Sequence, residues 1–325
     1  MNREKFTRNH KNNYVSKDLA IVIPTKDRPK EIICLLNSIV ELDSKVGRII
    51  IVASGQDICE LVMKFYGELP VEYHYSEPGQ IKQRNKGISY LDSSTKLVAT
   101  IDDDMCFSKT AISEMIKFWN KVEPETAGVG FNITNLPNHK HTWLRGLFDL
   151  SVPEPGKVLD SGANTSITNA KESFRSEWLN GGGTVWRQKI LKEFPHQEIL
   201  SKWAVGEDLI YSYPIGQKLP LYVCASATIE TEVVELTRES PKICLYRART
   251  NFLWGLYFVQ KNSQLSIFKF FKRKLAENIW FIFKGFSNLE LQRIYMSLGI
   301  LSGLILSLNC IIKKQNIIEI IEKNT

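Results

Sequence analysis

The chain is poor in the residues that build disulfide frameworks and thiol or imidazole metal sites. Its 325 residues include six cysteines and five histidines. No C-x-x-C pair occurs, and the cysteines stand far apart, at positions 34, 59, 106, 224, 244 and 310. This spacing argues against a zinc-ribbon type of site and favours a reducing compartment. His139 and His141 lie two residues apart in a polar stretch, where we expect them to be solvated rather than ligating.

Other common signatures are also missing. The first residues, MNREKFTRNHKNNY, contain no apolar run, so we expect no secretory signal. The chain has neither a P-loop nor a G-x-G-x-x-G pattern, and no Ser-His-Asp arrangement can be recognised. With 43% hydrophobic and 24% charged residues, the composition is that of a globular protein.

Positive charge is scarce over most of the chain and concentrated at its end. The net charge is +7, but Leu236 to Thr325 holds 14 Lys/Arg and 5 Asp/Glu, which gives +9. The other 235 residues therefore carry 28 against 30, or −2. We expect this basic region, which is also rich in aromatic residues, to meet an anionic membrane surface. We expect no nucleic-acid partner.

Short apolar segments alternate with helical patterns over the first half of the chain. The segments that predict buried strands are Leu19 to Ile23, Arg48 to Val52, Val71 to Tyr75, Leu97 to Ile101 and Gly128 to Ile133. Helical patterns begin at Pro29, Leu61, Gly79 and Ala111, and further ones cover Trp186 to Phe194 and Glu207 to Ile215. This alternation predicts an α/β fold, with a mostly parallel, Rossmann-like sheet covered by helices on both faces. Residues 135–180 are predicted to be largely irregular.

Polar clusters follow three of the predicted strands. They are Thr25 to Arg28, Ser54 to Asp57, and Asp102 to Asp104. Parallel sheets bind their ligands at the carboxyl ends of the strands, so these clusters are expected to share one site. Three adjacent carboxylates repel one another unless a cation compensates them, and a divalent metal ion would do so while attracting a diphosphate. The alternative is that the aspartates only cap a helix or form a turn.

Three further segments carry candidate site residues. Glu207-Asp208 opens a helix, where acidic residues complement the helix dipole or where one of them serves as a general base. Arg84 and Asn85 follow Gly79 on a helix near the strand ends, and could meet a phosphate or simply face solvent. The glycines Gly181, Gly182 and Gly183 either allow a backbone to approach a ligand or form a plain hinge.

Taken in order, these segments resemble the family-2 glycosyltransferases, which have the GT-A fold of nucleotide-diphospho-sugar transferases. The segments that carry the resemblance are AIVIPTKDRP (20–29), GQIKQRNKGI (79–88), VATIDDDM (98–105), NGGGTVWRQKIL (180–191) and GEDLIYSYPI (206–215). The resemblance covers roughly residues 18 to 225 and is closest to non-processive members, because the Q-x-x-R-W pattern is absent.

The resemblance implies a metal-dependent, inverting transfer of a sugar to a hydroxyl of a glycan or lipid-linked acceptor. Asp208 would be the catalytic base, and Asp104 would hold Mn or Mg. Asp102 would contact the ribose or the donor sugar, and Asp103 would line the same nucleotide-sugar site with the most structural role of the three. The remaining nucleotide-sugar-binding residues implied by the resemblance are Pro24, Thr25, Arg28, Asp57, Gly79, Arg84 and Asn85. The residues implied for the acceptor or donor-sugar loop are Gly181, Gly182, Gly183 and Glu207.

The sequence departs from the family pattern in two places. The aspartate that often follows the second strand and reads the base is replaced by Ala53-Ser54, with Asp57 close by. The metal-binding histidine after the Glu-Asp helix is missing, because His196 is the last histidine of the chain. Two alternatives therefore stay open: a transferase-like protein that binds a sugar nucleotide without activity, and a nucleotidyl or phosphoryl transferase that uses the same acidic loop.

The C-terminal quarter has a different pattern. Between Phe268 and Lys284, Phe and Trp residues alternate with Lys and Arg, as in helices that bind membrane surfaces. Ile294 to Ile312 then runs 19 residues without a charge and contains a G-x-x-x-G at Gly299 and Gly303. This segment could span a membrane, lie on it, or pack as a soluble helix. The predicted organisation is a polar tail (1–17), a GT-A domain (18–235) and a basic, membrane-associated helical appendage (236–325). We expect a cytoplasmic protein bound to the inner face of the membrane.

Overall fold

The computed structural model describes residues 12–136, 141–198, 206–232, 239–313 and 316–324. These residues form two compact units. The first comprises the described parts of Met1–Asn138, Ile167–Glu198 and Tyr211–Glu232, and the second those of His139–Ser166, Ile199–Ile210 and Val233–Thr325. The first unit contains the sheet, and the second consists mainly of helices.

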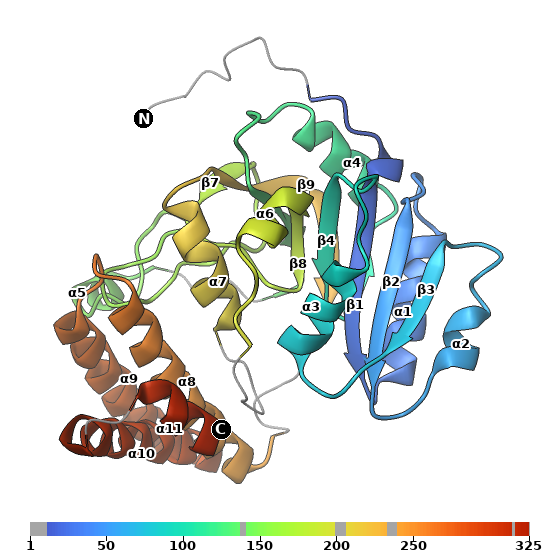
Figure 1. The fold of residues 1–325 in the computed structure, drawn as a ribbon. Coiled ribbons are helices and arrows are strands. Elements are labelled where there is room, and N and C mark those ends of the chain that lie inside the picture. The colour runs from blue at the N-terminus through green and yellow to red at the C-terminus, as the bar shows by residue number, and fades with distance from the viewer. Residues whose placement is uncertain (1–11, 137–140, 199–205, 233–238, 314–315, 325) are drawn as a thin grey trace. The chain divides into compact units, whose positions relative to one another are not determined.

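The first unit is built on one nine-stranded sheet with the order β3-β2-β1-β4-β8-β6-β9-β5, and β7 also pairs with β9 (Figure 1). Strand β1 pairs in parallel with β2 and β4, β2 pairs in parallel with β3, and β6 does so with β9. Strand β8 lies antiparallel between β4 and β6. The strands are β1 Leu19–Lys26, β2 Arg48–Ser54, β3 Val71–Tyr75, β4 Leu97–Ile101, β5 Met105–Phe107, β6 Gly128–Ile133, β7 Phe174–Ser176, β8 Gly183–Arg187 and β9 Leu221–Thr231.

Helices cover both faces of this sheet, as the alternation of strands and helices predicts. Ile21 and Ile23 of β1 belong to one buried cluster together with residues of α1 (Pro29–Val40) and α4 (Ala111–Trp119). Val22 points to the opposite face, where Gly87 of α3 (Gln80–Ser89) lies so close that an added Cβ would be 2.5 Å from its Cγ1. Successive strand residues thus alternate between two helical layers, and the strand ends are left to form a site.

The strands β3, β4 and β6 have the predicted bounds, whereas the region after the three glycines differs from the prediction. Residues 183–187 form β8, so the predicted helix at Trp186 to Phe194 shrinks to α6, Gln188–Glu193. A short apolar run is ambiguous between strand and helix, and here pairing with β4 and β6 decides it. Strands β5, β7 and β9 are further elements that the sequence reasoning did not identify. The other short helices are α2, Cys59–Met63, and α7, Glu207–Gly216.

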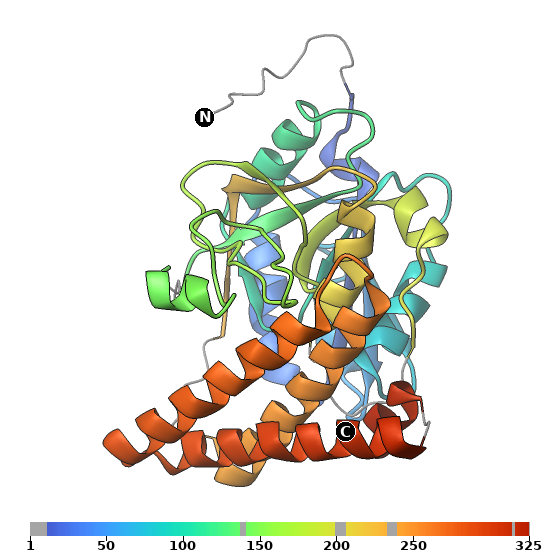
Figure 2. The same cartoon turned by 90° about the vertical axis from the view of Figure 1, so that its left-hand side faces the viewer.

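The second unit contains α5 (Trp143–Leu147), α8 (Pro241–Lys261), α9 (Ile267–Ser287), α10 (Leu291–Lys313) and α11 (Ile317–Asn324). Ser240 and Ser266 cap α8 and α9, since each hydroxyl accepts a hydrogen bond from the backbone N–H three residues later. Figure 2 shows α9 running into α10 through a short turn. Among the described helices, α10 is long and apolar enough over Leu291–Asn309 to cross a membrane, and 28% of this stretch is buried. Core helices of soluble proteins can be equally long and apolar.

Candidate active site

The three aspartates lie where β4 ends, and the glycine segment holds them there. The backbone N–H of Asp102 donates to the carbonyl of Gly182 at 3.1 Å, and the Thr100 hydroxyl donates to the carbonyl of Gly181 at 2.7 Å. A Cβ on Gly182 would stand 2.0 Å from a carboxylate oxygen of Asp102. Gly182 is therefore needed for close approach to Asp102 itself, while Gly183 begins the neighbouring strand β8.

Helix α3 supplies the donors that hold the Asp102 carboxylate. Gln80 Nε2 and Arg84 Nη2 lie 3.0 and 3.1 Å from Asp102 Oδ1. Arg84 is fully buried, and the Asp102 carboxylate compensates its charge. Gln83 fixes the helix to the strand ends, because its amide donates to the carbonyls of Thr25 and Val52, both at 2.7 Å. Gly79, with φ 143°, directs the chain into α3.

Asp103 is held by the loop that follows β1. It accepts hydrogen bonds from the Thr25 hydroxyl at 2.7 Å and from Arg28 Nη1 at 2.9 Å. Burial raises the pKa of Asp103 to about 6, although Thr25 and Arg28 act in the opposite direction. Pro24 precedes Thr25 in β1 and pairs with Val52. The side chain of Asp103 is therefore engaged in joining β1 to the aspartate loop.

Asp104 is held less closely than Asp103. Arg28 Nη1 lies 3.1 Å from its Oδ2, and the Thr231 hydroxyl lies 3.4 Å from its Oδ1. Its side chain is 24% exposed, against 8% for Asp103. Burial raises the pKa of Asp104, and the neighbouring charge of Asp102 adds to the shift. A second cation at this carboxylate would therefore be favourable.

Asn85 points away from the aspartates. Its amide donates to the His196 carbonyl and to Glu198 Oε1, both at 3.0 Å. The His196 ring stacks on Tyr211 with centroids 3.5 Å apart. Burial, together with the charge of Arg84, holds the pKa of His196 well below its usual value. A buried imidazole thus lies close enough to Arg84 to feel its charge.

The loop after β2 is organised by Asp27, a residue that the sequence reasoning did not select. Asp27 has φ 54°, and its Oδ1 accepts a hydrogen bond from the backbone N–H of Gln56 at 2.7 Å. Asp57 instead bonds to its own loop, through the N–H of Cys59 and the hydroxyl of Tyr73. These bonds lower the pKa of Asp57, which is exposed. Asp27 follows Lys26 at a strand end, and that position was its only signal in the sequence.

Glu207 and Asp208 form the first turn of α7, as predicted. The backbone N–H of Leu209 donates to Asp208 Oδ1 at 2.8 Å. Residues 207–210 belong to the second unit, whereas the three aspartates belong to the first. The catalytic role of Asp208 and the acceptor-side role of Glu207 therefore stay predictions. Besides Asp27, the sequence reasoning did not select Gln80 and Gln83, although they lie in the segment 79–88 that carries the resemblance, or Thr231, which belongs to no such segment.

The donor atoms present fit a metal ion that shares its coordination with a diphosphate. Within the described ranges, no three His, Cys, Asp or Glu side chains gather as a metal site. Mn and Mg are commonly bound through one or two carboxylates together with substrate phosphates, so a protein cage is not required. Asp104 offers such a carboxylate, and the Thr231 hydroxyl meets its Oδ1 only through a long contact of 3.4 Å.

A mixed sheet with an acidic loop at the carboxyl ends of its parallel strands defines a GT-A class of fold. Residues 20–171 match the family model described as glycosyl transferase family 2. This chain therefore carries a glycosyltransferase family 2 domain and is a glycosyltransferase. No curated protein sequence matches the chain.

Solved structures resemble this chain at low sequence identity. The mannosyltransferase PcManGT from Pyrobaculum calidifontis, in complex with GDP-Man and Mn2+, is 11% identical, with a TM-score of 0.54, and the match covers 90% of this chain and 88% of that one. S. aureus TarS 1-349 is 17% identical, with a TM-score of 0.49 and coverage of 79% and 72%. Its complex with UDP-GlcNAc is 14% identical, with a TM-score of 0.47 and coverage of 91% and 92%. The first of these establishes the shared fold.

Proposed function

We propose that this glycosyltransferase moves a sugar from a nucleotide diphosphate to a hydroxyl group, with inversion at the anomeric carbon. One observation carries the proposal: a hydroxyl from β1, a guanidinium from the residue before α1, and an amide and a guanidinium from α3 converge on three aspartates at the carboxyl end of β4. Such an arrangement suits a ligand that combines a sugar or ribose with a diphosphate, because it offers carboxylates for hydroxyls and cations for phosphates.

The donor would be held by the loop after β1 and by α3. Arg28 bridges Asp103 and Asp104, and its side chain is 48% exposed, so part of its guanidinium is open to a phosphate. Asp102 is 29% exposed and would accept hydrogen bonds from the ribose or the donor sugar. Arg84 would act through Asp102, since it is buried behind it. Thr25, Gly79 and the Asp27 loop would shape the nucleotide pocket.

Asp208 would be the general base of the transfer. Its carboxylate would take the proton of the acceptor hydroxyl while that oxygen forms a bond to the anomeric carbon. The bond between the anomeric carbon and the diphosphate oxygen breaks at the same time, and the nucleotide diphosphate leaves with its electron pair. Attack from the side opposite the leaving group inverts the configuration. Glu207 and the glycine segment would line the acceptor or donor-sugar side.

Asp104 would hold the divalent metal, Mn or Mg, through its open carboxylate oxygen. A metal ion bound there would neutralise charge that grows on the leaving diphosphate. Arg28 already stands between Asp103 and Asp104, so the same loop offers a fixed positive charge beside the metal position. The GDP-Man and Mn2+ in the PcManGT structure, which shares the fold, support this proposal.

The acceptor we propose is a glycan or a lipid-linked glycan at the inner face of a membrane, with the enzyme bound there from the cytoplasm. The charge of +9 between Leu236 and Thr325 supports this location, since cytoplasmic membrane surfaces are anionic.

A thermal-shift panel of nucleoside diphosphates, with and without Mn, tests the donor site. One nucleotide should raise the unfolding temperature in the presence of Mn, and Asp104→Ala should remove the metal dependence. Stabilisation that is equal with and without Mn would overturn the metal assignment. Turnover of a nucleotide sugar then distinguishes an enzyme from a protein that binds the nucleotide without activity.

A further inference from the structure

Helix α9 of the second unit buries charged residues and exposes large apolar ones, which is the reverse of the usual distribution. Its buried positions include three polar residues, Arg273, Lys274 and Asn278, and the half-buried Glu277 beside them has a side chain that is 24% exposed. Its exposed positions are large and apolar at helical spacing: Phe268 79%, Leu275 62%, Ile279 58%, Phe283 64% and Phe286 68%. A helix in water normally buries its apolar stripe and exposes its charges. The outer face of α9 is thus unsuited to water.

The buried charges fix this orientation. Lys274 Nζ donates to Glu277 at 2.8 Å and to Asn251 of α8 at 3.0 Å, and Arg273 Nε lies 3.5 Å from Glu277. Both cations also face the ring of Phe270, at 5.3 and 5.8 Å. The two ion pairs lie within α9 and would survive a rotation of the helix. A rotation that buried the apolar stripe would instead break the Lys274 bond to Asn251 of α8 and separate the Phe270 ring from Phe252 of α8. The exposed stripe is therefore a fixed feature of the helix.

Helix α10 also exposes an apolar face, and it packs on α8 through small residues. Gly299 and Gly303 lie against α8, where an added Cβ would stand 2.3 Å from the Leu245 carbonyl oxygen and 2.8 Å from Phe252. The G-x-x-x-G of the sequence is thus a packing face for α8. The exposed side of α10 carries large aliphatic residues, which are Leu298, Leu301, Ile305, Leu308 and Ile312.

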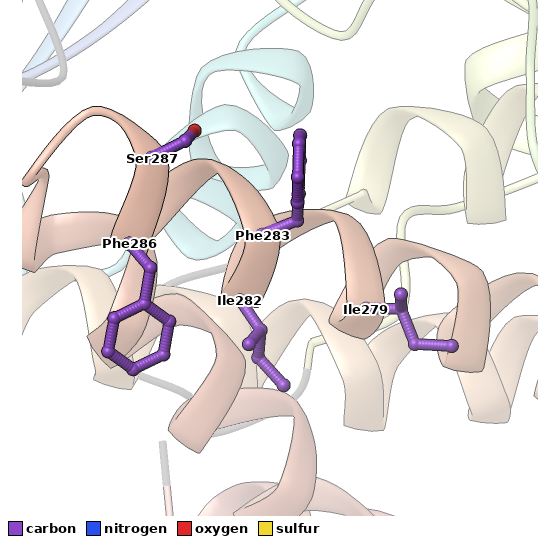
Figure 3. Close-up of a pocket in the computed structure, with 5 residues that line it drawn as sticks. All are labelled: Ile279, Ile282, Phe283, Phe286 and Ser287. Atoms are coloured by element: carbon purple, nitrogen blue, oxygen red, sulfur yellow. The ribbon is translucent and has the colours of Figure 1, made fainter.

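The outer surface of α9 is hollowed as well as apolar. An open groove of about 700 Å³ is lined by Ile279, Ile282, Phe283, Phe286 and Ser287, all from α9 (Figure 3). After Phe286 in the sequence, in the turn before α10, Leu289 is 91% exposed. From Phe268 to Phe286 the stripe extends about 27 Å at 1.5 Å per residue.

We propose that the outer faces of α9 and α10 insert into the headgroup and acyl boundary of an anionic phospholipid bilayer, with the helices parallel to its surface. Charge selects this occupant over a second copy of the chain: Leu236 to Thr325 carries +9, so two copies would repel, whereas anionic lipids attract. Lys272 lies within the stripe itself, and its Nζ donates to the carbonyl of Leu147 in α5 at 2.8 Å. Basic residues beside Phe, Trp and Leu are typical of helices that lie in a membrane interface.

This inference rests on the membrane location proposed above and adds the surface that provides it. Vesicle flotation of the full chain tests it, with phosphatidylcholine alone or mixed with phosphatidylglycerol. The double variant Phe283→Ser/Phe286→Ser changes two exposed residues of α9, and Tyr66→Ser, a 66% exposed aromatic of the first unit, is the matched control. We expect binding to the anionic vesicles, a loss of roughly tenfold or more in the double variant, and no change in the control.

Two results would overturn the inference. One is the absence of flotation, or equal flotation of the double variant and the unchanged chain. The other is a dimer in light scattering that the double variant disperses while neither protein floats, which would assign the stripe to a second copy. The nucleotide-induced thermal shift, measured on the same proteins, separates these failures from a failure of the donor site, because it requires no lipid. An unchanged shift in the double variant also verifies that the first unit is folded.

Discussion

Two regions of this protein bury charged side chains, and they do so to opposite effect. At the end of β4, Arg28 and Arg84 hold the three aspartates, but Asp102 and Asp104 stay 29% and 24% exposed. In α9, Lys274 and Arg273 pair with Glu277 while their own side chains are only 6% and 8% exposed. The first cluster keeps oxygens accessible for a ligand. The second uses its charges internally, and so fixes a helix rather than binding a substrate.

The largest effect should come from replacing the proposed general base. Asp208→Asn should slow sugar transfer roughly 10²–10⁴-fold, the usual contribution of a general base. The donor-induced thermal shift should persist, because the substitution leaves the aspartate loop intact. Transfer by Asp208→Asn at a near-normal rate would refute its assignment as the base. Steady-state rates with a saturating nucleotide sugar provide the measurement.

Removing the acid of the second cluster should affect stability instead. Glu277→Gln would remove the carboxylate that pairs with the buried Arg273 and Lys274, and should lower the free energy of unfolding by about 3–5 kcal/mol. Glu114→Gln is the matched control, because Glu114 also pairs with a lysine three residues away, at 2.8 Å, yet that lysine is 63% exposed. The control should cost about 0–1 kcal/mol in urea unfolding. Equal losses of unfolding free energy in the two variants would mean that the buried ion pairs of Glu277 do not stabilise α9.

A substitution at the closest backbone approach tests how tightly the first cluster is built. Gly182→Ala places a methyl group 2.0 Å from the Asp102 carboxylate, so it should cost about 1–3 kcal/mol in stability and weaken donor binding. Gly67→Ala is the control, since nothing lies within 4 Å of its added Cβ. Thermal unfolding of both variants checks the difference. If Gly182→Ala unfolds at the same temperature as Gly67→Ala and binds donor equally well, the loop must have room for the added methyl group.

The smallest effect concerns pH. Because the pKa of Asp103 is raised to about 6 in the folded metal-free protein, above its ordinary value of 3.8, folding favours its protonated form. Its contribution to stability is therefore fully present below pH 3.8 and is lost as pH rises through about 6. Asp103→Asn should remove this step, worth roughly 1–3 kcal/mol, from the difference between two unfolding titrations. A difference that stays flat from pH 4 to 7 would contradict it.

Much of the fold follows from local pattern. Strands β3 and β4 and helix α4 end where apolar periodicity places them, because continuous apolar runs bounded by polar clusters have few alternatives. Strand β8 was misread because its five residues fit either class, and only pairing between β4 and β6 selects the strand. Strand β9 pairs with β6, β5 and β7, and its existence depends on partners distant in sequence.

The sequence by itself determined the alternating α/β architecture, the acidic loop after a buried strand, and the basic, aromatic character of the last quarter. These depend on residue type and short-range periodicity. Only the tertiary structure decided that Arg84 holds Asp102, that Asn85 turns to His196, that Gly182 lies against a carboxylate, and that α9 exposes its apolar side. Each of these depends on which distant segment packs opposite a side chain, and helical periodicity gives two faces without saying which one is buried.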